Sequence, residues 1–227
     1  MASCRVRASI LLPIPNNPDP DLVRATRRGD RGAFLELVQR HAPAVRAIVE
    51  ARMPGSDAID DETVAAFQRI HKTLVVVRDL TWFHLFAIRT AQTYLDSRRY
   101  RHDDPGPAAA PWFAPLTLGQ REALFLVERC GPQPRFPPIE YLGIGETAFE
   151  ARLERGQAIR AKAGEWGDAG LMDQGNIDSI VARVDEALGA AATPKERRNI
   201  RRMPLSLAFV LAVAVAGLLA ALLFRPR

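Results

Sequence analysis

WFHLFAIRTAQTYLDSRRYRH, from Trp82 to His102, is predicted to form a core helix with a basic end. Its apolar and small residues recur at helical spacing, namely Phe83, Phe86, Ala87, Thr90, Ala91, Tyr94 and Leu95. They form one face of a helix of about five to six turns. The stretch then runs into Arg98–Arg101, which suits contact between guanidinium groups and nucleic-acid phosphates. Because the helix dipole favours arginine in any last turn, a solvated helix end is the other interpretation.

Further helical patterns lie on the N-terminal side of this stretch. Asp21–Arg28 predicts a short helix, and Asp30 is a candidate N-cap for the next one. That second helix is expected to reach about Met53, with a kink or a division near Pro43. A third helix is expected from about Ile59, with an inward face formed by Val64, Phe67, Ile70 and Leu74.

The helical patterns predict an all-α chain, and proline-rich segments divide it into two small helical domains. Residues 1–20 are expected to be a disordered leader, and 103–115 a linker between a first domain at 21–102 and a second at 116–165. The second domain predicts a helix, a short helix, a glycine-containing turn and a last helix, at Leu118–Arg129, Ile139–Leu142, Gly143 and Glu146–Ala163. This order is the helix-turn-helix layout.

The C-terminal part carries membrane signals. Residues 166–204 are expected to be a juxtamembrane segment with an amphipathic helix, whose apolar face is Ile177, Ile180, Val181, Val184 and Leu188. Residues 205–224 contain no charge and no proline, and as a helix they span about 30 Å, the thickness of a bilayer's hydrocarbon core. More basic residues precede this predicted transmembrane helix than follow it, so the N-terminal part is expected in the cytoplasm.

Composition narrows the classes of function. The 31 Lys and Arg residues exceed the 26 Asp and Glu residues, and the pI of about 9.7 fits an anionic partner. Cys4 and Cys130 are far apart, and the four histidines show no metal-ligand spacing. The chain is therefore predicted to have no catalytic activity of its own, no metal site and no cofactor.

Four segments, taken in order, resemble the extracytoplasmic-function sigma factors of bacterial RNA polymerase. They are RRGDRGAFLELVQRHAPAV from Arg27, DDETVAAFQRIHKTL from Asp60, WFHLFAIRTAQTYLDSRRYR from Trp82, and LTLGQREALFLV with YLGIGETAFEARLERGQAIRAKA from Leu116 and Tyr141. Together these segments cover most of residues 22–165. The domain order of the family implies a region 2-like bundle at 21–102 and a region 4-like helix-turn-helix domain at 116–165.

The resemblance implies core RNA polymerase and promoter DNA as partners. In this family the second segment binds polymerase, which implies contacts by Asp61, Phe67, Arg69 and His71. The third segment melts and reads the −10 element and the last helix reads the −35 element, which implies DNA contacts by Arg98, Arg99, Arg101, Arg152 and Arg155. A tethered member is expected to be a single-pass protein of the inner membrane, with an anti-sigma factor or a membrane protease as a further partner.

Several positions depart from the family pattern. Val64 and Ala65 stand where the family usually has a Gln-Glu pair. Thr93 stands in place of the usual Asp, and Asp96 in place of a basic residue. An acidic stripe runs along the predicted recognition helix, formed by Glu146, Glu150 and Glu154. Because carboxylates repel phosphate, we expect weak or altered reading of the −35 element.

Three interpretations follow from these patterns. The leading one is a membrane-tethered sigma factor that binds core RNA polymerase and directs promoter-specific initiation. The alternative is a degenerate sigma-like membrane adaptor or regulator that no longer initiates transcription, which the replaced pair and the acidic stripe favour. A third interpretation treats Ile177–Leu188 as a built-in anti-sigma segment packed on the sigma domains, against the simpler interpretation of a juxtamembrane spacer.

Overall fold

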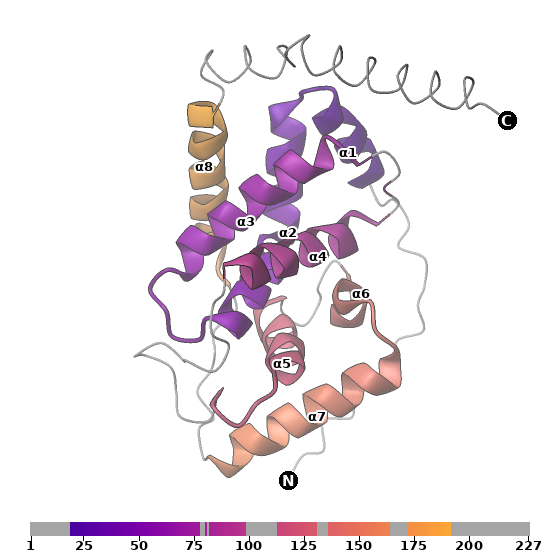
Figure 1. Ribbon diagram of the computed structural model, residues 1–227, viewed down its shortest axis with the longest axis vertical. Helices are drawn as coiled ribbons and strands as arrows, with labels where there is room; N and C mark the ends of the chain where they lie inside the picture. The colour runs from indigo at the N-terminus through magenta and orange to yellow at the C-terminus, as the bar shows by residue number, and fades with distance from the viewer. Residues whose placement is uncertain are drawn as a thin grey trace, which may run out of the picture. The chain divides into compact units, whose positions relative to one another are not determined.

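The computed structural model describes residues 19–77, 80, 82–98, 113–130, 136–163 and 172–191 (Figure 1). All regular secondary structure in these ranges is helical, which confirms the all-α class. The described part contains eight helices: α1 Asp19–Arg27, α2 Arg31–Arg52, α3 Ile59–Leu74, α4 Phe83–Ser97, α5 Leu118–Cys130, α6 Pro138–Leu142, α7 Glu146–Lys162 and α8 Gln174–Ala191. The described residues up to Val184 belong to one compact unit, and the end of α8 belongs to a second unit, Asp185–Arg227.

The junction between α1 and α2 has the predicted capping chemistry. Asp30 is the N-cap of α2 and accepts a hydrogen bond at 3.0 Å from a backbone N–H of the first turn. Gly29 before it has a φ of 94°, a left-handed conformation that suits glycine. The predicted leader is too long, because Asp19 already belongs to α1 and is buried against His41. The remaining leader residues, 1–18, lie outside the described residues.

Helix α2 is not divided at Pro43. It is one helix of 22 residues with this proline inside it. An interior proline removes a backbone hydrogen bond and costs about 3 kcal/mol. Burial along α2 outweighs this cost, since its fully buried apolar residues include Phe34, Leu37, Val38, Val45, Ile48 and Val49. Helices α1, α3, α4 and α5 all pack on α2, which is therefore central to the unit (Figure 1).

Helix α4 is shorter than predicted, because it ends at Ser97 and not near His102. Its buried residues are Phe83, His84, Ala87, Ile88, Ala91 and Leu95. The predicted inward face is partly wrong, since three of its members are only half-buried, namely Phe86, Thr90 and Tyr94. The inward face of α4 is thus turned relative to the predicted one, and the Tyr94 hydroxyl lies at the edge of the core. It donates a hydrogen bond there to Glu62 of α3 at 2.7 Å.

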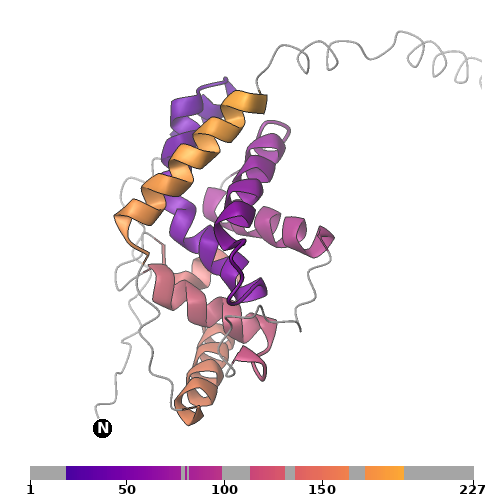
Figure 2. The same cartoon turned by 90° about the vertical axis from the view of Figure 1, so that its left-hand side faces the viewer.

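Helices α5, α6 and α7 follow the predicted order of helix, short helix, turn and helix. Gly143 between α6 and α7 has a left-handed φ of 60°, and a Cβ there would lie 2.8 Å from Leu85 Cδ1 on α4. Helix α7 packs on α5 at one end of the unit (Figure 1 and Figure 2). Because α5 also packs on α2, residues from both predicted domains contribute to one compact unit. Of the predicted linker at 103–115, only residues 113–115 lie within the described residues.

Helix α8 has the predicted amphipathic face. Ile180 and Val184 are 1% and 0% exposed, and Ile177 and Val181 are half-buried. Across the described ranges, no helix is both long enough and apolar enough to cross a membrane. The predicted transmembrane helix at 205–224 lies outside the described residues.

Candidate functional site

The four residues predicted to bind polymerase lie on α3 in different environments. Asp61 and Arg69 are exposed, and His71 is half-buried with its ring 4.6 Å from an aromatic ring of α2. Burial, and then the charge of Lys72, lower the pKa of His71. Phe67 is 0% exposed and belongs to the core. Of the four predicted contacts, only Asp61 and Arg69 therefore offer a partner an exposed polar side chain.

Glu62 is absent from the predicted site, yet it connects α3 to the basic end of α4. It is 6% exposed, and it accepts hydrogen bonds from the Tyr94 hydroxyl at 2.7 Å and from Arg98 Nη2 at 3.1 Å. The Arg98 side chain remains 53% exposed, so its guanidinium is held in position while staying accessible to a phosphate. Arg99 and Arg101 lie outside the described residues. As one of three acidic residues in the first turn of α3, Glu62 carries no sequence signal for this role.

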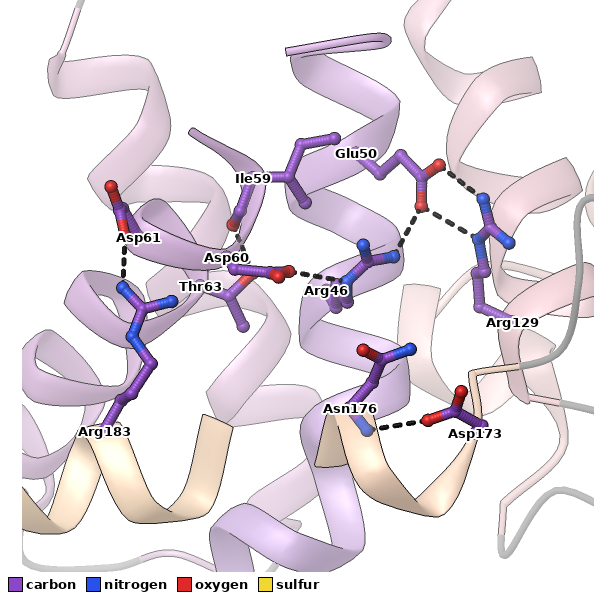
Figure 3. A network of polar contacts seen from close by, with 10 residues as sticks. All are labelled: Arg46, Glu50, Ile59, Asp60, Asp61, Thr63, Arg129, Asp173, Asn176 and Arg183. Carbon is purple, nitrogen blue, oxygen red and sulfur yellow. Dashed lines mark hydrogen bonds and ion pairs between the residues drawn. The ribbon is translucent and has the colours of Figure 1, made fainter. Parts of the chain in front are cut away.

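Glu50 on α2 joins the start of α3 to the end of α5 through ion pairs (Figure 3). Its Oε2 accepts from Arg46 Nη1 at 3.1 Å and from Arg129 Nε at 2.9 Å, and its Oε1 accepts from Arg129 Nη2 at 2.5 Å. Arg46 in turn donates from Nε to Asp60 at 2.9 Å. These contacts fix the start of α3 relative to α2 and α5.

Asp61 is already in contact with another part of the chain. Figure 3 shows Asp61 and Arg183 of α8 pointing toward one another, and they form an ion pair. The Asp61 side chain is 72% exposed and that of Arg183 is 39% exposed. An exposed pair contributes about 0–1 kcal/mol. The burial of Ile180 and Val184 on the same helix is therefore the stronger contribution to the position of α8.

The predicted recognition helix, α7, presents an acidic face to solvent. Its exposed acidic stripe is formed by Glu146, Glu150 and Glu154. Arg155 is also exposed and stays available to DNA. Arg152 is half-buried and turned toward α5, since a Cβ on Gly119 would lie 3.1 Å from its guanidinium. The two predicted DNA contacts of α7 therefore differ in the structure, since Arg155 is exposed and Arg152 is turned toward α5. The sequence pattern treats them alike.

A buried polar and aromatic cluster joins α1, α2, α4 and α6. His41 Nε2 and Asp19 Oδ2 are 2.9 Å apart, with side chains that are 0% and 2% exposed. The Tyr141 hydroxyl lies 3.3 Å from His41 Nδ1. Phe136 stacks on both His41 and His84, with ring centroids 5.7 Å and 4.3 Å apart. These two histidines, which have no metal-ligand spacing in the sequence, are thus core residues.

His84 is expected to make stability depend on pH. Burial, and then the nearby His41, lower the pKa of His84 from 6.5 to about 4, while Asp19 opposes the shift. Between these values the unfolded chain binds a proton that the folded chain does not, so the free energy of unfolding falls as pH drops through 6.5 and levels off below about 4. The free energy of unfolding, measured with urea, is expected to fall between pH 7 and pH 4.5. This fall is expected to be larger in the unaltered chain than in His84→Phe, by about 2–3 kcal/mol. Equal pH dependence in both would contradict a neutral His84.

The described residues do not assemble a metal site from His, Cys, Asp or Glu side chains. Burial raises the pKa of the Cys130 thiol to about 12, which keeps the thiol protonated at neutral pH. Comparisons of the chain with models of known families, with curated proteins and with solved structures found no match.

Proposed function

We propose that the chain is a membrane-tethered sigma factor of the extracytoplasmic-function type. The exposed face of α3, with Asp61 and Arg69, binds core RNA polymerase, and the end of α4, with Arg98, contacts promoter DNA. The observation that carries the proposal is the hydrogen bond at 3.1 Å from Arg98 to Glu62, a buried carboxylate of α3. A fixed guanidinium beside a partner-binding helix is the kind of pre-positioned contact that a promoter-reading protein needs.

The remaining parts of the chain take supporting roles in this proposal. Residues 21–102 and 116–165 act as region 2-like and region 4-like modules joined by 103–115. Residues 205–224 anchor the chain in the inner membrane with its N-terminal part in the cytoplasm. Helix α7 contributes less to DNA binding than the end of α4, because the exposed stripe that includes Glu150 and Glu154 opposes phosphate.

The contact of Arg183 with Asp61 adds a restraint to the proposal. Helix α8 is held in place by the burial of Ile180 and Val184, and its Arg183 pairs with Asp61, the carboxylate that polymerase would contact. Helix α8 then acts as a built-in anti-sigma element. Because the ion pair is exposed, it lowers polymerase affinity without blocking the surface.

Binding to polymerase tests the proposal directly. The full-length chain in detergent is expected to co-elute with bacterial core RNA polymerase and to support a promoter-dependent transcript. Asp61→Ala is expected to weaken binding about 10-fold or more, because a charged hydrogen bond contributes roughly 1.5–3 kcal/mol. Arg183→Ala is expected to strengthen binding, and Asp57→Ala, an exposed residue just before α3, serves as the matched control. If the unaltered chain neither co-elutes nor supports a transcript, the proposal fails.

A degenerate membrane adaptor is the second candidate, and the exposed acidic stripe of α7 favours it. The double variant Glu150→Lys and Glu154→Lys distinguishes the two. In a working sigma factor the reversed charges are expected to shift the set of transcribed promoters, because two repulsive groups become phosphate-binding groups. In an adaptor the set stays the same. RNA sequencing of cells that carry either form of the chain gives the answer.

A further inference from the structure

A polar cavity that is open to solvent lies where α2, α4, α5 and α7 meet. Its volume is about 400 Å³, and its wall includes Arg52, Arg89, Gln92, Asp96, Glu122 and Arg152. Cavities of about 300–1,000 Å³ are typical of sites for small molecules. No part of the proposed sigma function uses this cavity.

The charges around the cavity are only partly neutralised. Arg52 is paired with Glu122, and its Nη2 also lies 3.3 Å from Asp96 Oδ1. Arg89 and Arg152, by contrast, have no carboxylate partner among the described residues, although Arg89 donates to a backbone carbonyl of α6 at 3.3 Å. Two guanidinium groups, one from α4 and one from α7, therefore line this space without an ion pair of their own within the described ranges, while its two carboxylates are engaged with Arg52.

The neighbouring groups favour this arrangement of cations. Gln92 Nε2 donates to Glu122 Oε1 at 3.0 Å, and Arg52 donates to the same oxygen, so this carboxylate is engaged by groups other than Arg89 and Arg152. Gly119 allows the Arg152 guanidinium to lie against α5, at a distance of 3.1 Å from where a Cβ would stand. In addition, Arg52 Nε is buried without a hydrogen-bond partner. Because this atom has almost no accessible surface, it adds to the positive charge beside the cavity but does not itself offer a donor to a ligand there.

We propose that this cavity binds a small phosphorylated molecule of about nucleotide size, with its phosphate between Arg89 and Arg152. Guanidinium groups bind phosphate through paired, charge-assisted hydrogen bonds, whereas an uncharged ligand would leave both charges unmatched. Asp96 at the same wall accepts hydrogen bonds from sugar hydroxyls and repels additional phosphates. A monophosphate is therefore preferred over a triphosphate.

The position of the site implies a consequence for the fold. Its two phosphate-binding arginines come from α4, in the first predicted domain, and from α7, in the second. A bound phosphate would bridge the two parts and stabilise their packing. Ligand binding is thus expected to raise the midpoint temperature of unfolding, because the ligand binds the folded chain alone.

Titration calorimetry on the full-length chain in detergent, in buffer free of phosphate and sulfate, tests the proposal with AMP, ATP, adenosine and inorganic phosphate. AMP and inorganic phosphate are expected to bind, AMP more tightly than ATP, and adenosine is expected to show no binding. Arg89→Ala and Arg152→Ala are each expected to weaken AMP binding about 10- to 100-fold. Arg155→Ala removes the same charge from an exposed position of α7 and is expected to leave the affinity unchanged.

A second variant protects the test against loss of folding. Gly119→Ala keeps both arginines and improves helix propensity, but its methyl group displaces the Arg152 guanidinium, so AMP affinity is expected to fall while thermal stability does not. Equal binding of adenosine and AMP, no heat at millimolar AMP, or equal losses in Arg152→Ala and Arg155→Ala would each overturn the proposal. Displacement of AMP by duplex DNA, with the same dependence on Arg89, would overturn the small ligand in favour of a backbone phosphate.

Discussion

Phe67→Ala is expected to lower the free energy of unfolding by about 3–5 kcal/mol, the usual cost of truncating a buried phenylalanine. The side chain is 0% exposed, and it lies on the inward face of α3 with Ile70 and Leu74. Truncation removes buried apolar area and leaves a cavity that the packed helices cannot fill completely. Asp61 and Arg69 keep their exposed positions, so the proposed binding to polymerase is expected to change little in the fraction of chains that remain folded.

Urea unfolding followed by circular dichroism measures this effect, and binding to core polymerase is measured on the same samples. Trp82→Ala provides the matched control, because Trp82 is a large aromatic residue that is 57% exposed, and its truncation is expected to cost less than about 1 kcal/mol. The opposite pattern, with stability preserved and polymerase binding lost in Phe67→Ala, would restore Phe67 as a contact residue. The pair of measurements thus separates a core role from a binding role.

The helices were predictable because each depends on neighbours in the sequence. Val64, Phe67, Ile70 and Leu74 repeat at helical spacing, and all four are buried in α3 as expected. Asp30 caps α2, and Gly143 takes the left-handed turn before α7. Tertiary packing overrides one such signal at Pro43, where the burial of apolar residues along α2 outweighs the cost of an interior proline.

The contacts of the candidate site were not predictable, because they join residues far apart in the chain. Glu62 and Arg98 are separated by 36 positions, and Arg52 and Glu122 by 70 positions. Nothing in the sequence distinguishes the buried Glu122 from an exposed residue such as Glu154. Which acid meets which base depends on how helices pack, and the helical period alone does not determine that arrangement.

Glu122→Ala is expected to destabilise the unit by about 3–5 kcal/mol, because it leaves the buried Arg52 guanidinium without its main partner. The two side chains are 4% and 7% exposed, and Glu122 also accepts a hydrogen bond from Gln92 at 3.0 Å. Replacing both members, Arg52→Met with Glu122→Leu, is expected to recover most or all of the stability, since neither variant side chain needs a charged partner. Urea unfolding of the single and double variants gives the coupling between the two positions.

The same double variant tests how the unit works if the chain is a sigma factor. The positions of the −10 and −35 elements differ by 25 base pairs, which is about 85 Å at 3.4 Å per base pair. A compact unit with as many residues as this one, Met1–Val184, is only about 40 Å across. The end of α4 and α7 can therefore reach the two elements together only if α5 leaves α2. Opening exposes Arg52 and Glu122, which water solvates well, but it would expose the apolar pair of the double variant at a cost. The double variant is therefore expected to keep most or all of the stability of the unaltered chain and yet to be less active in promoter-dependent transcription. Full activity at equal stability would mean that the two parts need not separate.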